Sequence, residues 1–213
     1  MYQRFKDRED AALKLIPLLD KYRKQPCVVM AVPRGGVPLA AVIANYFHFP
    51  LELLMSKKIA HPNYPEFAIG AVSLKNHVLD EINNISDSYI NQEIQRIRIS
   101  LREKYKKFTG NHSPPGLKNK ILLIVDDGIA TGNTILASIE MLRQQHPKKI
   151  IVAVPVIAAD SVKKISNETD ELVCIYEPKH FGSVGNYYNN FEQGSDEEVI
   201  RKLKESDSME KAV

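Results

Sequence analysis

A run of five apolar residues, Ile121–Val125, is followed by two adjacent carboxylates and then by a turn rich in glycine and threonine. An apolar run of this length, flanked by turn residues, is typical of a buried strand in a parallel sheet. The apolar periodicity that follows predicts a helix over about 132–145. The first N–H groups of such a helix lack internal partners and, with the helix dipole, favour an anion. The segment therefore predicts a strand, a turn and a helix with an anion-binding loop between them.

The side chains of this turn add a second kind of binding group. Asp126 and Asp127 can grip a diol or a divalent cation, and Thr131 and Thr134 supply hydroxyls. Glycines at 128 and 132 let the backbone approach a ligand closely. A phosphate-binding turn beside carboxylates that can bind a polyol or a metal ion is suited to a sugar phosphate. The turn matches neither the Walker A pattern nor the dinucleotide-binding pattern. The alternative to a sugar-phosphate site is a Rossmann-like unit that carries Asp and Gly at the tip of its strand without binding such a ligand.

The whole segment resembles the phosphoribosyl-pyrophosphate (PRPP) motif of type I phosphoribosyltransferases, which is an apolar strand, two acidic residues, a short spacer and Thr-Gly-x-Thr. The resemblance implies that Asp126 and Asp127 hold the ribose hydroxyls, directly or through Mg²⁺. It also implies a 5′-phosphate site formed by Gly128, Ile129, Ala130, Thr131, Gly132, Asn133 and Thr134. In many purine-type relatives an acidic residue precedes the first Thr. Ala130 takes that place here, which argues against a 6-oxopurine acceptor.

A second loop, Arg34-Gly35-Gly36, follows a predicted strand at 27–32. On its own, a Gly-Gly pair at such a junction indicates only a tight turn. The segment is similar to the pyrophosphate loop of the same family, in which backbone N–H groups bind the leaving group. Arg34 would add a planar cation with several donors. The family often holds a cis peptide in this loop, and the sequence leaves that open.

The segment after the second predicted strand supplies further candidates. Lys57 and Lys58 end the expected strand 51–57, where paired lysines often face solvent; the resemblance implies instead that one of them meets pyrophosphate. Residues 59–68 correspond to the mobile catalytic loop of the family, which closes over PRPP and excludes water. His61 and Glu66 are candidates there for acid–base or gating roles, and a solvated loop is the alternative.

The acceptor is the least defined part of the sequence. The family usually carries a variable hood that recognises it. Residues 176–194 are the expected contributor, and the N-terminal helix is a second candidate. Phe181 and Tyr188 could stack an aromatic acceptor, or pack the segment onto the sheet. The full-length resemblance is to a bacterial phosphoribosyltransferase-like subgroup whose acceptor the sequence does not reveal.

Composition excludes several classes of protein. The chain has 213 residues, enough for a single domain over 1–213, and a net charge of +3, which argues against nucleic acid as a partner. Apolar runs are too short to span a bilayer and the N-terminus carries no apolar signal segment, so we expect a cytoplasmic protein. Cys27 and Cys174 each lie in an apolar run and are expected to be core residues.

The order of elements predicts the fold class. We expect a helix over 7–24 that Pro17 bends or divides, and helices at 37–47, 88–107 and 159–167, with a last one from about 196. Further strands are expected at 69–74, 77–79, 120–126, 149–156 and 171–176. This alternation predicts an α/β fold, a Rossmann-like and mainly parallel sheet with helices on both faces plus a small hood. Ligands of such sheets bind at the carboxyl ends of the strands.

The resemblance implies a Mg²⁺-assisted enzyme that moves 5-phosphoribosyl from PRPP to a small-molecule nitrogen nucleophile and releases pyrophosphate. Two alternatives stay open: a PRPP- or nucleotide-sensing regulator without catalysis, and a hydrolase of phosphorylated sugars or nucleotides. Relatives of this type are commonly dimers, so the expected assembly is a homodimer.

Overall fold

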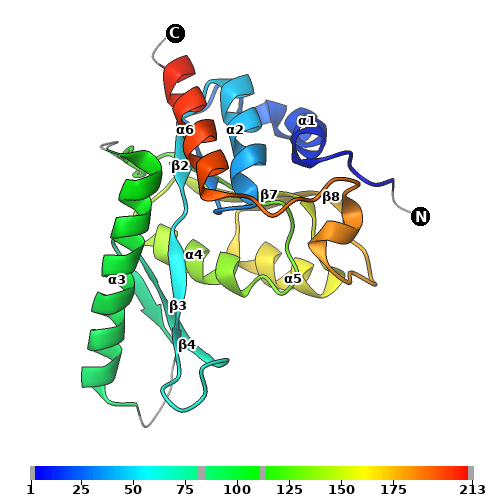
Figure 1. The fold of residues 1–213 in the computed structure, drawn as a ribbon. Helices are drawn as coiled ribbons and strands as arrows, with labels where there is room; N and C mark the ends of the chain where they lie inside the picture. Colours follow the sequence, from blue (N-terminus) through cyan, green and yellow to red (C-terminus); the bar gives the residue numbers. More distant parts are fainter. Residues whose placement is uncertain (1–2, 81–84, 111–113, 211–213) are drawn as a thin grey trace.

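A five-stranded parallel sheet forms the centre of the computed structural model, which describes residues 3–80, 85–110 and 114–210. The strand order is β2-β1-β6-β7-β8. Their bounds are Leu51–Leu53 for β2, Cys27–Ala31 for β1, Ile121–Val125 for β6, Lys149–Val156 for β7 and Glu171–Tyr176 for β8. The expected mainly parallel α/β fold is confirmed (Figure 1).

Both faces of this sheet are buried, because successive residues of the central strands enter different apolar layers. Val28 and Met30 of β1 pack with Ile135 and Ile139 of α4, whereas Val29 of β1 packs in the layer that holds α1 and α2. Strands buried on both faces read as continuous apolar runs. This explains why Ile121–Val125 shows no alternation of polar and apolar residues.

Helices cover the two faces unequally (Figure 1). One face carries α1, α2 and α6, which pack against one another, and the other carries α4 and α5. Their bounds are Arg8–Leu19 for α1, Gly36–Phe47 for α2, Asp196–Glu210 for α6, Asn133–Arg143 for α4 and Ala159–Glu168 for α5. The helix α1 continues past Pro17 and ends in a 3₁₀ turn, Asp20–Tyr22. Asp7 caps it by accepting a hydrogen bond from the N–H of Asp10, 2.9 Å away.

The connections create a topological switch point between β1 and β6. From β1 the chain passes through α2 to β2 on one side, and from β6 it passes through α4 to β7 on the other. Loops at the carboxyl ends of two such strands diverge and leave a crevice between them. The two candidate loops, after residue 32 and after residue 125, begin at this point.

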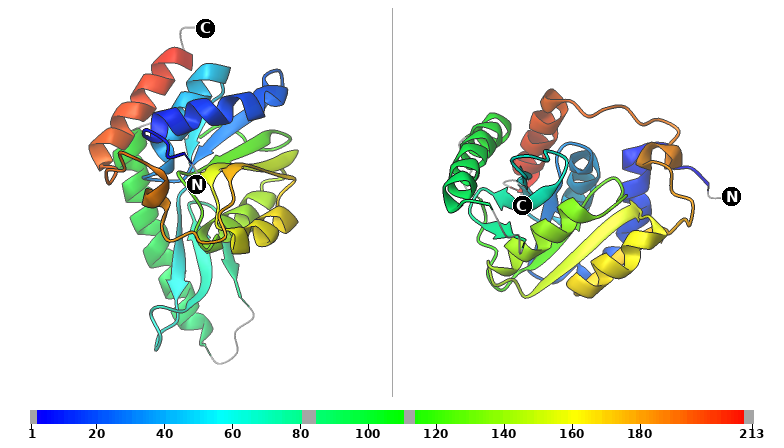
Figure 2. Two further views of the ribbon diagram at one scale, coloured as in Figure 1. Left: turned by 90° about the vertical axis from the view of Figure 1, so that its right-hand side faces the viewer. Right: turned by 90° about the horizontal axis from the view of Figure 1, so that it is seen from below.

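A small antiparallel sheet and a long helix extend away from the parallel sheet (Figure 2). The sheet has the order β3-β4-β5 and the helix α3 packs against β3 and β4. Their bounds are Ser56–Ala60 for β3, Ala68–Ser73 for β4, His77–Leu79 for β5 and Asp87–Thr109 for α3. The expected single strand over 51–57 was wrong, because Leu51–Leu53 pairs with β1 whereas Ser56–Ala60 pairs with β4.

Residues near the two ends of the chain lie together beside the site. Phe5 forms a parallel bridge with Tyr188, just after a short 3₁₀ helix, Val184–Tyr187. The N–H of Phe5 donates to the carbonyl of Tyr187 at 2.8 Å, and the N–H of Asn189 donates to the carbonyl of Phe5 at 2.8 Å. Within the described ranges, the helices include none with the length and apolar character needed to cross a bilayer.

Candidate active site

The two acidic residues after β6 lie at the carboxyl end of the central strand and are joined by a hydrogen bond. The backbone N–H of Asp127 donates to Oδ1 of Asp126 at 2.9 Å, which fixes the first carboxylate against the turn. The Asp127 residue is only 9% exposed. Its carbonyl accepts a 2.6 Å hydrogen bond from the hydroxyl of Tyr188, so the backbone at this position is also held from the far end of the chain.

The glycine loop after β1 lies directly against these carboxylates. A Cβ placed on Gly35 would stand 2.2 Å from Oδ2 of Asp127, and one on Gly36 would stand 2.5 Å from the carbonyl oxygen of Val125. Only glycine fits both positions without displacement. The peptide bond between Pro33 and Arg34 is cis. The structure thus brings together the two loops that the sequence singled out.

Arg34 points from this loop toward the start of α6. Its Nη1 lies 3.6 Å from Oδ1 of Asp196, whose other oxygen pairs with Nζ of Lys107 at 2.8 Å. The Arg34 side chain is 37% exposed, so it is accessible to a ligand. Gly194 lies beside it, since a Cβ there would be 3.4 Å from Cβ of Arg34.

The loop over 128–134 leads from β6 into α4. Ile129 continues the pairing of the sheet through a parallel bridge with Ile157, and Ser161 Oγ donates to the carbonyl of Ala130 at 2.6 Å. Gly132, with φ of +76°, precedes the helix and provides no side-chain cap. The hydroxyl-bearing residues Thr131 and Thr134 are exposed. A helix N-terminus without a side-chain cap offers its N–H groups to an anion.

Burial dominates the electrostatics of the two carboxylates. Burial raises the pKa of Asp126 well above its ordinary value, and the neighbouring Asp127 carboxylate raises it further. Burial also raises the pKa of Asp127, while hydrogen bonds from Arg8 act in the opposite direction. Because the two acids are adjacent and buried, the charge of one affects the pKa of the other.

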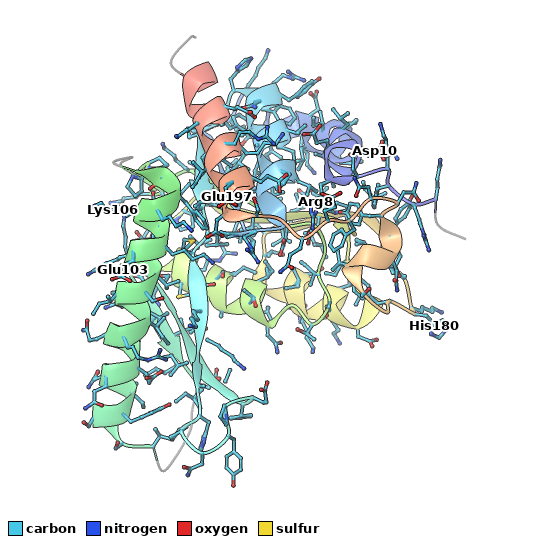
Figure 3. The ribbon with its side chains drawn as sticks, in the orientation of Figure 1. Arg8, Asp10, Glu103, Lys106, His180 and Glu197 are labelled. Atoms are coloured by element: carbon cyan, nitrogen blue, oxygen red, sulfur yellow. The ribbon has the colours of Figure 1, made fainter. Side chains whose placement is uncertain are left out.

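Arg8 is a site residue that the sequence analysis did not find. Its Nε and Nη2 donate to Oδ2 of Asp127 at 3.0 and 2.8 Å, and its Nη1 donates to the carbonyl of Glu192 at 2.7 Å. The guanidinium carbon lies 4.1 Å from the centre of the Phe191 ring. Figure 3 shows Arg8 at the start of α1, facing the segment that precedes α6. Arginine at a helix start carries no motif, so no local signal indicated this role.

Residues from the two loops, from the start of α1 and from the segment before α6 line one open cavity of about 330 Å³. Its wall combines two arginines, one carboxylate, an aromatic ring and two glycines. The lining residues are Arg8, Arg34, Gly35, Asp127, Phe191, Gln193 and Gly194. A cavity with this balance of cations favours an anionic ligand.

A comparison with protein families identifies this arrangement. Residues 3–190 match the family model of the phosphoribosyl transferase domain, and this range includes every group described above except those at 191–196. The chain belongs to the phosphoribosyl transferase family.

Relatives of the chain support the family assignment. It is 33% identical over 204 residues to a Mycobacterium tuberculosis protein provisionally named a phosphoribosyl transferase, an alignment that covers 93% of this chain and 46% of the relative. The chain therefore spans about half the length of that relative. A uracil phosphoribosyltransferase from Acinetobacter baylyi is 30% identical over 103 residues, 48% of this chain and 46% of that one.

A solved structure resembles nearly all of this chain. The crystal structure of a Thermus thermophilus protein has a TM-score of 0.86 and 32% identity, covering 95% of this chain and 99% of that one.

Lys57 and Lys58 lie in the antiparallel sheet and Glu66 lies in its hairpin turn, and these three are not among the residues that line the cavity. Lys57 and Lys58 do not end a core strand; they pair with Val72 and Ala71 inside the antiparallel sheet. Nζ of Lys58 donates to the carbonyls of Pro65 and Glu66 at 3.2 and 3.3 Å and lies 3.9 Å from the Glu66 carboxylate. These contacts tie the hairpin turn to its own strand.

The aromatic candidates for the acceptor have other partners. Tyr188 is 3% exposed, and its ring packs against Phe5 and Phe191 at 5.4 and 5.1 Å. The ring is therefore enclosed by its neighbours. Phe181 packs against Tyr187 at 5.5 Å and is half-buried. The packing alternative describes Tyr188 better than acceptor binding does.

The candidate site suits a magnesium ion that is shared with a substrate. The residues that the structure describes include no group of three or more Asp, Glu, His or Cys side chains able to hold a metal. Asp126 and Asp127 provide at most two carboxylates, and one oxygen of each already accepts a hydrogen bond. Mg²⁺ commonly binds one or two carboxylates and completes its shell with water and substrate phosphates. The donor set fits such a shared ion.

Proposed function

We propose that the protein transfers the 5-phosphoribosyl group of PRPP to a nitrogen nucleophile and releases pyrophosphate. The observation that carries the proposal is the contact between two loops, in which Gly35 lies against the carboxylate of Asp127. A glycine loop suited to a pyrophosphate and Asp127, one of the two acids suited to a pentose, then line one cavity. Family membership supports the same reaction class.

Each part of PRPP has a matching group in this proposal. The 5′-phosphate would bind residues 128–134, where the start of α4 and two exposed threonines offer donors. The ribose hydroxyls would meet Asp126 and Asp127. The pyrophosphate would bind Arg34 and the backbone of Gly35 and Gly36. Mg²⁺, when bound with PRPP, would neutralise charge on the phosphates.

The chemistry needs few proton transfers from the protein. The bond from C1 of ribose to the pyrophosphate oxygen breaks, and its electron pair leaves with pyrophosphate. The nitrogen lone pair forms the new C1–N bond, and the nitrogen gives up its proton to solvent or a nearby base. Positive charge develops on the ribose ring near Asp126 and Asp127, while Arg34 faces the negative charge on the leaving group. Fixed groups matched to developing charges lower such a barrier.

The hairpin between β3 and β4 would close over bound PRPP and limit the access of water. Lys58 and Glu66 already contact each other across this hairpin, so they would move together. Residues 176–194 would form the hood above the acceptor, with Phe181 as its remaining aromatic candidate. We extend the proposal to a cytoplasmic homodimer. Light scattering after gel filtration would measure the mass in solution and so test whether the protein is a dimer.

The reaction is tested by measuring pyrophosphate release from PRPP and magnesium, with and without a panel of nucleobases that includes uracil and adenine. Mass spectrometry of the products identifies a ribosylated acceptor. Release that depends on one acceptor is the expected result. Binding of PRPP without turnover would point to a sensor, and release without any acceptor would point to a hydrolase.

A further inference from the structure

The guanidinium of Arg8 connects three parts of the cavity that are distant in sequence. It contacts the carboxylate of Asp127, the carbonyl of Glu192 and the ring of Phe191. We infer that Arg8 is a positioning residue for the proposed reaction, which holds the Asp127 carboxylate in the orientation that PRPP requires. The inference rests on the proposed function, because it assigns Asp127 to the ribose.

The hydrogen bonds from Arg8 to the Asp127 carboxylate reach one of its two oxygens. Both donors of Arg8 converge on Oδ2, and a Cβ placed on Gly35 would stand closer to that oxygen, at 2.2 Å, than to Oδ1, at 3.1 Å. Among the hydrogen bonds of the described residues, the side-chain donors to this carboxylate use Oδ2, so Oδ1 is the oxygen that remains for a ligand. Two donors on one oxygen fix the rotation of the carboxylate about its side-chain bonds.

Arg8 is itself anchored independently of Asp127. The hydrogen bond from Nη1 to the carbonyl of Glu192 is 2.7 Å long, and the ring of Phe191 supports the flat face of the guanidinium. Its side chain is 13% exposed. A ligand that takes up Oδ1 would leave all of these contacts in place, so a binding event does not require Arg8 to depart.

The planar fork of arginine is specific to this arrangement. Three different nitrogens point in fixed directions toward two acceptors, and one flat face rests on an aromatic ring. A lysine would restore the positive charge and one hydrogen bond, but it could not reproduce the fork. Glutamine would remove the charge and most of the donors.

A matched control exists elsewhere in the chain. Arg23 also pairs with an aspartate, with its Nε 2.9 Å from Oδ1 of Asp20, and its guanidinium also lies over aromatic rings, at 4.9 Å from Tyr46 and 5.1 Å from Phe47. These contacts are remote from the cavity. Arg23→Gln removes the same kinds of contact without touching the site.

The experiment measures binding of PRPP with magnesium by calorimetry for the intact chain and for Arg8→Gln, Arg8→Lys and Arg23→Gln. Thermal unfolding checks that each variant is folded. We expect Arg8→Gln to weaken binding by about tenfold or more, Arg8→Lys to recover part of the loss and Arg23→Gln to bind as the unaltered chain does.

The outcomes separate this inference from the proposed function. If the unaltered chain does not bind PRPP, the proposed function itself fails. If it binds and folded Arg8→Gln binds equally well, Arg8 does not position Asp127; tighter binding would mean that the guanidinium competes with the ligand, which also overturns the inference. Should Arg8→Gln fail to fold, Arg8→Lys decides, because unchanged binding in that variant would show that the fork is not needed.

Discussion

The α-carbon of Gly35 lies so close to Asp127 that an added Cβ would stand 2.2 Å from the Oδ2 of that carboxylate. This separation is far shorter than an ordinary van der Waals contact. The loop after β1 and the loop after β6 can therefore meet only where the first of them lacks a side chain.

Replacement of Gly35 by alanine should displace Asp127 and weaken PRPP binding by about tenfold or more, because the carboxylate contacts depend on its place. Calorimetry with PRPP and magnesium measures the effect. Gly116→Ala is the control, since a Cβ at Gly116 meets nothing within 4 Å. Equal affinity in the two variants would contradict the close approach as a functional feature.

Asp127→Asn should lower turnover by about a hundredfold, or ~2.7 kcal/mol of barrier, because a neutral amide no longer stabilises the positive charge on ribose. The amide has nearly the shape of the carboxylate, so the fold should survive. Steady-state pyrophosphate release and circular dichroism measure the two quantities. A folded variant with full activity would remove Asp127 from the mechanism.

Tyr188→Phe should destabilise the protein by about 1–2 kcal/mol, because the carbonyl of Asp127 loses the 2.6 Å hydrogen bond from the tyrosine hydroxyl in a buried setting. Denaturant unfolding of the two proteins measures the difference. Tyr64→Phe is the matched control, as Tyr64 is 68% exposed, and its unfolding should change little. Similar losses in both variants would contradict the importance of the buried bond.

Asp170 should contribute stability that disappears in acid. Partial burial by itself raises the pKa of Asp170, but hydrogen bonds from the N–H of Ile150 and from Arg143 outweigh it and lower the pKa below 3.8. A pKa lowered in the folded state gives stability that is present above the unfolded value and is lost as pH falls through the folded value.

Urea denaturation at several pH values checks this loss of stability in acid. It gives the free energy of unfolding of the unaltered chain and of Asp170→Asn at each pH. We expect the variant to be less stable at neutral pH and the two proteins to converge below about pH 3.8. A difference that stays constant across that range would show that the charge of Asp170 is not involved.

The sequence allowed the core of the fold and the meeting of the two candidate loops to be predicted because their signals are local. The strands at 149–156 and 171–176 and the start of the last helix at 196 agree with the structure, as each has its own apolar run or turn residues. The segment 51–57 was misread because a change of strand partner between residues 53 and 56 leaves no trace in the apolar pattern.

The remaining parts of the site depend on contacts between distant residues. Arg8 and Asp127 are 119 positions apart, and neither the spacing nor the local pattern indicates their pairing. Tyr188 looks like a surface aromatic in a polar segment, yet the bridge of its backbone to Phe5 places its ring in the core. Tertiary packing decided both positions, and a single sequence does not contain that information.

The bridge between Phe5 and Tyr188 also has a consequence for the order of assembly during synthesis. The segment around Phe5 is synthesised first, and its partner segment around Tyr188 follows about 180 residues later. A nascent chain halted after α5 would already contain residues 128–134. It would still lack Tyr188, whose hydroxyl donates a hydrogen bond to the carbonyl of Asp127.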